Sequence, residues 1–192
     1  MNRAIRAAGF LALLIISACA RTVVLKYDPI VRGIEDPTSE VALKVVDGRE
    51  PEHGGTNTAE VGRVRGGYGN PFPLFDTDPH KVSQLVRDAT TDALSHARVS
   101  VQPGSPRVLV ATVKTFWLDG YVGYKAAVDV ECQLQDLQGT VLWTATIGGA
   151  AGGTAGWSLT GFVASTYQTA LANYAENALV QFNTPAFQKN VF

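Results

Sequence analysis

The chain has 192 residues, of which 46% are hydrophobic, and a formal net charge of −1. This composition can fill the core of one domain of ordinary size, and it supplies neither a basic stripe for nucleic acid nor an acidic tail. Nucleic acid is therefore not expected as a partner, and the net charge favours no other class of partner.

The N-terminal residues have the pattern of an export signal. Arg3 and Arg6 precede an apolar run over residues 7–16. Ten helical residues rise only about 15 Å, which is too short for a bilayer core of about 30 Å. A basic start, a short apolar run and small residues after it predict a removable signal peptide over residues 1–18.

The end of this signal resembles the lipobox of bacterial lipoproteins, an aliphatic residue and two small residues before a cysteine: Ile16-Ser17-Ala18-Cys19. The resemblance implies diacylglycerol on the sulfur of Cys19, cleavage before it, and a further acyl chain on the new N-terminus. Two or three acyl chains hold a protein stably on a membrane, whereas one chain holds it only marginally. An ordinary export signal followed by a chance cysteine is the alternative.

The mature chain then divides into two parts. Residues 19–40 are expected to be the lipidated cysteine and a tether, with one edge strand over 22–27, because Pro29, Gly33 and Pro37 interrupt regular structure. Residues 41–192 are expected to form a single globular domain.

The domain begins with strands and an irregular stretch. Residues 41–47 are rich in β-branched side chains and predict a buried strand, and 61–65 a short one. The glycines and prolines of 66–73 predict an irregular loop. Apolar residues at three- and four-residue spacing then predict an amphipathic helix over 79–97.

The sequence of the second half of the domain predicts a meander of three strands and a helix. Residues 107–118, 121–135 and 140–147 have strand patterns, with a turn at Asp136–Gly139. The small residues of 148–156 predict a strand end and turn that let the last helix pack closely, and that helix is expected over 159–181. The order β-loop-α-β-β-β-α predicts a two-layer α+β domain, a mainly antiparallel sheet with two helices packed on one face.

These pieces together resemble the YajG-type family of uncharacterised bacterial lipoproteins. The resemblance rests on the lipobox ending in Cys19, the strand 41–47 followed by Gly48-Arg49, the later Val61-Gly62, the amphipathic helix, the long hairpin and the closing helix. It covers most of the mature chain. The family has no described catalytic residues, so the resemblance implies none here. Ala20 follows the cysteine where the lipoprotein pattern links aspartate to inner-membrane retention, which favours the periplasmic face of the outer membrane.

No residue pattern predicts catalysis. The histidines His53, His80 and His96 lack metal-ligand spacing, so neither a metal nor another cofactor is expected. Cys132 falls on the predicted core face of its strand, where a thiol is inert. We therefore expect a protein that is not an enzyme.

Two groups of residues are candidates for binding a partner. Asp47 and Arg49 flank Gly48 at a strand end, where they either clamp a polar partner or pair within a turn. Tyr68, Phe72 and Phe75 are expected in the irregular loop, where they either anchor a partner or fold back on the core. The first hypothesis is a binding module for an envelope protein or polymer, lipid-anchored to the outer membrane. The alternative is a small-ligand or lipid-binding accessory of an envelope transport system, which predicts an apolar cleft between helices and sheet.

Overall fold

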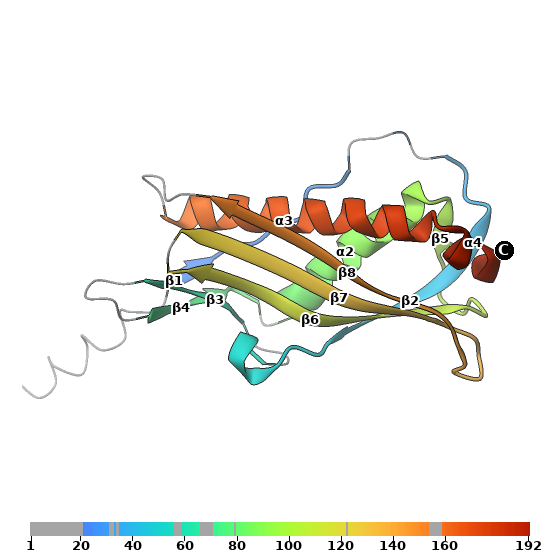
Figure 1. Cartoon of the computed structure of the whole chain (residues 1–192), viewed down its shortest axis with the longest axis horizontal. Helices are drawn as coiled ribbons and strands as arrows, with labels where there is room; N and C mark the ends of the chain where they lie inside the picture. Colours follow the sequence, from blue (N-terminus) through green and yellow to red (C-terminus); the bar gives the residue numbers. More distant parts are fainter. Residues whose placement is uncertain are drawn as a thin grey trace, which may run out of the picture.

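A mixed, eight-stranded sheet and a layer of helices form the domain (Figure 1). The computed structural model describes residues 21–30, 33, 35–55, 59–65, 71–78, 80–121, 123–153 and 159–192. Cys19 lies outside these residues. The strands are β1 (Arg21–Val23), β2 (Ser39–Asp47), β3 (Glu60–Arg65), β4 (Pro71–Asp76), β5 (Val99–Val101), β6 (Val108–Gly120), β7 (Tyr124–Gln135) and β8 (Val141–Gly153).

The long strands β6, β7 and β8 form an antiparallel meander, as the alternating sequence predicted. The other edge of β6 carries two strands end to end, both parallel to it. β2 pairs with the first half of β6, and β3 pairs with its last three residues. These parallel pairings were not predicted, so the sheet is mixed where a mainly antiparallel sheet was expected. β4 and then β1 extend the sheet beyond β3, and β5 pairs with the start of β2.

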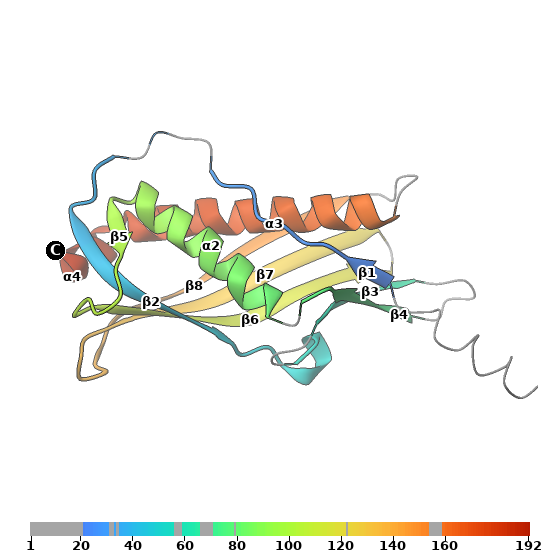
Figure 2. The same ribbon diagram turned by 180° about the vertical axis from the view of Figure 1, so that it is seen from behind.

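Three α-helices of the described part of the chain pack on the sheet: α2 (Lys81–His96), α3 (Leu159–Phe182) and α4 (Pro185–Val191). Figures 1 and 2 show α2 and α3 side by side on one face of the sheet, which confirms the two-layer α+β prediction. The short α4 adds a third helix beyond the two predicted. Thr184 caps α4, and its Phe187 is fully buried against Trp143 and Phe182.

The layer between the helices and the sheet is filled by side chains. β7 contributes every second residue to it, as expected for a strand with one covered face, and β6 does so on either side of a bulge between Val113 and Thr115. Its largest members are the fully buried Tyr167, Tyr174, Phe116, Phe182, Leu109, Leu118 and Leu134. None of the described helices is long and apolar enough to span a bilayer.

α3 covers the open edge of β8 through a close backbone approach. A Cβ atom on Gly149 would overlap backbone atoms of Ala170 and Tyr174. This contact lets the Asn173 and Asn177 side chains of α3 donate hydrogen bonds of 2.7 Å to β8 carbonyls at residues 150 and 148. The predicted close packing of the last helix on these small residues is therefore confirmed, and β8 ends within the segment, but residues 148–153 are strand and not turn.

The expectation of an irregular loop over 66–73 fails at its end. Pro71 and Pro73 belong to β4, which pairs with β3. Among the described residues, β1 pairs with β4 only from Leu74 onward, so no described strand lies beside the two prolines on that edge. A missing N–H is tolerated at such a position.

The expected tether is partly folded onto the domain. Val23 and Leu25 are 3% and 1% exposed. The Leu25 amide donates to the buried Asp76 carboxylate at 3.0 Å. Further along, the Tyr27 hydroxyl and the Ile30 amide donate to Asp92 of α2 at 2.6 and 2.7 Å. Figure 2 shows this N-terminal segment running beside α2 and α3 before it reaches β2.

Candidate functional site

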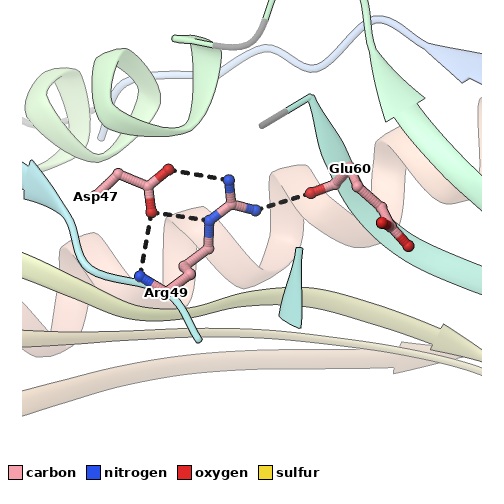
Figure 3. Close-up of polar contacts among 3 residues, drawn as sticks. All are labelled: Asp47, Arg49 and Glu60. Atoms are coloured by element: carbon pink, nitrogen blue, oxygen red, sulfur yellow. Dashed lines mark hydrogen bonds and ion pairs between the residues drawn. The ribbon is translucent and has the colours of Figure 1, made fainter. Parts of the chain in front are cut away.

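The candidates Asp47 and Arg49 form a buried ion pair at the junction between β2 and β3 (Figure 3). Arg49 Nε and Nη2 each donate to one carboxylate oxygen of Asp47 at 3.0 Å. Its Nη1 donates to the main-chain carbonyl of Glu60 at 2.8 Å. The guanidinium thus binds the last residue of β2 and the first residue of β3 at once.

Two glycines make room for this arrangement. Gly48 donates its amide to Val113 of β6, and a Cβ atom there would lie 2.7 Å from the Thr112 side chain. Gly54 has a φ of +92°, and a Cβ atom there would crowd the Glu60 carbonyl and Arg49 Nη1. Between them lies a turn of 3-10 helix, η2 (Pro51–His53). The chain therefore leaves the sheet after β2 and returns to the same edge at β3.

The pair is buried, which bears on what it can bind. The side chains of Arg49 and Asp47 are 0% and 2% exposed. A planar guanidinium with a bidentate carboxylate needs no further charge for neutrality. Of the two alternatives that the sequence left open, pairing within the turn fits this geometry, and clamping a partner from solution does not.

α3 reinforces the same junction. The Tyr167 hydroxyl of α3 donates a hydrogen bond to the Val61 carbonyl of β3. The Tyr167 ring stacks on the ring of Phe116 in β6, with 4.9 Å between the ring centroids. Burial raises the pKa of Tyr167 well above its ordinary value, so the phenol stays protonated and remains a donor. The junction between β2 and β3 is thus held by Arg49, which follows β2, and by Tyr167 of α3, which lies far away in the sequence.

The candidate aromatic residues separate onto different surfaces. Tyr68 lies outside the described residues. Phe72 and Phe75 are both half-buried in β4, not in a loop. Phe72 packs against the core, on the same face as the buried Leu74, so it folds back. Phe75 alternates with Leu74 and therefore points to the face of the sheet opposite the helices.

A second aromatic group on that open face was missed from the sequence. Trp117 of β6 lies there with His53 of η2, their ring centroids 5.8 Å apart. The Arg63 guanidinium lies 5.7 Å from the Trp117 ring and 3.2 Å from the Glu60 carboxylate. A bulge in β6 between Val113 and Thr115 turns Trp117 away from the core, and the parallel pairing of β3 with β6 brings Arg63 beside it.

The described residues contain no group of three histidine, cysteine or carboxylate side chains that would hold a metal ion. Cys132 is buried as predicted, and burial raises the pKa of its thiol to about 12. It is therefore protonated and inaccessible at neutral pH, unlike a nucleophilic cysteine. His96 is also buried, with Nε2 3.6 Å from the Asp92 carboxylate that holds the N-terminal segment.

The described clefts lie at the margins of the sheet. A cleft of about 550 Å³ lies between the start of β2, the start of β6 and α4, and is lined by polar residues such as Glu40, Arg107 and Lys189. The lipid-binding alternative predicts an apolar cleft between the helices and the sheet. In the described part of the chain, buried side chains fill this layer.

Comparison with solved structures finds the fold of this chain in one bacterial protein and weaker similarity to others. A Xanthomonas campestris protein described by the family model DUF330 is 17% identical, with 89% of this chain and 98% of that chain covered and a TM-score of 0.60. A minor lipoprotein from Acinetobacter baumannii is 10% identical over 76% of this chain and 92% of that chain, with a TM-score of 0.46. The PelC dodecamer from Paraburkholderia phytofirmans is 18% identical over 77% and 96%, with a TM-score of 0.35.

No family model matches the chain, and no curated protein matches it. The YajG-type resemblance therefore stays a prediction. Bacterial lipoproteins are among the structural neighbours of this chain.

Proposed function

We propose that this chain is a bacterial lipoprotein anchored through Cys19 to the periplasmic face of the outer membrane. The observation that carries the proposal is the position of Cys19, which ends a lipobox-like sequence and stands two residues before β1. Cleavage before Cys19 would leave every described strand and helix intact. The YajG-type resemblance points to the same class of protein.

The anchor is tested by fractionation of cells that express the full chain. The wild-type protein is expected with the outer membrane, and a Cys19→Ala variant in the soluble periplasmic fraction or with its signal uncleaved. A Cys19→Ala protein that is cleaved and still partitions with the outer membrane would contradict the anchor.

We further propose that the domain is a non-enzymatic binding module for an envelope protein or polymer. The open face of the sheet supports this role, because Phe75 and Trp117 are large aromatic side chains on the face opposite α2 and α3, where only the short η2 among the described helices approaches Trp117. Aromatic side chains with an adjacent arginine are typical of the residues that dominate binding energy at interfaces.

In-cell cross-linking from a photoreactive residue in place of Phe75 tests this surface. An adduct of defined mass is expected from position 75, and none from position 144, an exposed threonine on the same face of β8. The same adducts from both positions would rule out a specific surface around Phe75.

A further inference from the structure

We infer that the end of the sheet where β6 passes into β7 rests on the bilayer surface, so that the domain stands on the membrane instead of hanging from a flexible tether. The inference rests on the proposed acylation of Cys19 and adds to it the face that meets the lipid. The partner it identifies is the lipid headgroup layer.

The free chain between the anchor and the domain is short. Only Ala20 separates Cys19 from Arg21, the first residue of β1. Two residues span at most about 7 Å even when fully extended. A flexible tether of 22 residues would allow many orientations, but a link of this length does not.

The segment after this short link is firmly docked. β1 pairs with β4, and Val23 and Leu25 are buried in the core. The Leu25 amide is bound by the buried Asp76, and Asp92 binds both Tyr27 and the backbone beyond it. Pulling this segment away would expose apolar side chains and take these donors from the buried Asp76 and the partly buried Asp92, so it stays in place.

The chain enters the domain near one end of the sheet. The strand pairings place four residues side by side across the sheet: Arg21, Leu74, Gly62 and Leu118. Because β1 runs antiparallel to β6, the residues before Arg21 extend in the direction in which β6 advances. Two residues further in that direction, β6 reaches Gly120 and ends.

Cys19, two residues before Arg21, can therefore lie as far along the sheet as Gly120, two residues after Leu118. If Cys19 is acylated, the turn that follows Gly120 then reaches the lipid headgroups. Tyr121 in this turn is 43% exposed, and Lys125 at the start of β7 is exposed. A tyrosine and a lysine suit the interface between apolar lipid and water. The opposite end of β6 lies roughly 40 Å away, given 13 residues at ~3.3 Å each.

That distant end carries the other surfaces available to a partner. The turn between β7 and β8, with Leu137 70% exposed, and the polar cleft beside α4 both lie there. The inferred orientation presents both of them to the periplasm.

Fluorescence quenching on vesicles tests the orientation. Tyr121→Cys and Leu137→Cys variants of the mature, acylated protein are each labelled with a fluorophore, in vesicles of phosphatidylethanolamine and phosphatidylglycerol containing headgroup-nitroxide lipid. The native Cys132 is buried, so protein without an added cysteine should take up no label and serves as the control. We expect loss of fluorescence at position 121 and none at position 137.

Equal quenching at the two positions, or stronger quenching at 137, would overturn the inference. A flexible insertion of about 12 Gly/Ser residues between Ala20 and Arg21 should remove the difference. Persistent quenching at 121 despite the insertion would show that the short link does not set the orientation. Failure of the anchor itself is distinguished beforehand, because protein that is not acylated would not sediment with the vesicles.

Discussion

The meander of β6, β7 and β8 and the corner of the sheet formed by β1, β3 and β4 belong to one sheet but are held in different ways. The meander is local: each strand pairs with the next along the chain, and α3 packs on it through a backbone contact at Gly149. The corner joins segments separated by tens of residues, and buried polar groups hold it: Arg49 with Asp47, Tyr167 with Val61, and Asp76 with Leu25.

The meander and the corner differ because local and distant strand pairings need different interactions to specify them. Neighbouring antiparallel strands need little beyond alternation and a turn, since closing a short loop costs little entropy. Strands brought from far along the chain need groups whose geometry specifies one arrangement, and a bidentate guanidinium does this better than apolar contact alone. The corner also receives the N-terminal segment, so its integrity determines how an anchor at Cys19 would be joined to the domain.

The largest effect is expected from breaking the corner at Arg49. Arg49→Ala removes the guanidinium that binds the buried Asp47 carboxylate in two places and the bond to Glu60, which should lower the free energy of unfolding by about 3–5 kcal/mol. Chemical denaturation measures this change. An Asp47→Leu/Arg49→Met double variant, which buries no charge, should recover much of the loss. A loss below about 1 kcal/mol for Arg49→Ala would show that the pair does not hold the corner.

A smaller effect is expected from the close contact in the meander. Gly149→Ala forces α3 away from β8, because the added Cβ meets backbone atoms that cannot rotate aside, and should cost about 1–3 kcal/mol. The matched control is Gly148→Ala, whose Cβ meets chiefly the Asp129 side chain. Equal losses from the two variants, measured by thermal unfolding, would mean that the helix does not depend on this approach.

Releasing the N-terminal segment should affect the corner and leave the meander unchanged. Asp92→Ala removes the acceptor for Tyr27 and Ile30, at a cost of about 1–2 kcal/mol. Hydrogen exchange should speed up over residues 24–30 and stay constant in β7. Faster exchange throughout the meander would contradict the separation of the two regions.

The smallest effect concerns the turn of the meander. Backbone amides of Thr140 and Gln138 donate to the exposed Asp136 carboxylate and hold its pKa below the ordinary value, the Thr140 bond contributing most. A lowered folded-state pKa contributes stability that is complete above the unfolded-state pKa of about 4 and is lost as the pH falls through the folded value. The wild type should therefore exceed Asp136→Ala slightly in Tm at pH 6, and the gap should close below about pH 4. A Tm difference that grows as the pH falls would show that the ionised Asp136 carboxylate does not stabilise the turn.

The two regions also differ in how well the sequence predicts them. The meander follows from the alternation of 121–135 and the turn ending in Gly139, both of which are local signals. The corner escapes such reasoning because β2 and β3 share one edge of β6, a parallel arrangement that no local pattern specifies. The prolines of β4 and the glycines of β8 even resemble loop signals, since their roles depend on neighbours that are distant in the chain.

The candidate site shows the same limit: the sequence names single residues, but not the contacts that depend on distant strands. Asp47 and Arg49 were recognised as a possible pair, but their burial depends on the return of the chain at Glu60. Phe75 was identified, whereas Trp117 and Arg63 become neighbours only through the pairing of β3 with β6.

The central claim is that the folded domain is joined to lipid at Cys19, directly before β1. The mass of the N-terminal peptide from protein extracted from membranes tests this most directly. We expect a peptide that begins at Cys19 and carries diacylglycerol and one further acyl chain. A peptide that begins elsewhere, or that begins at Cys19 with an unmodified thiol, would contradict the account.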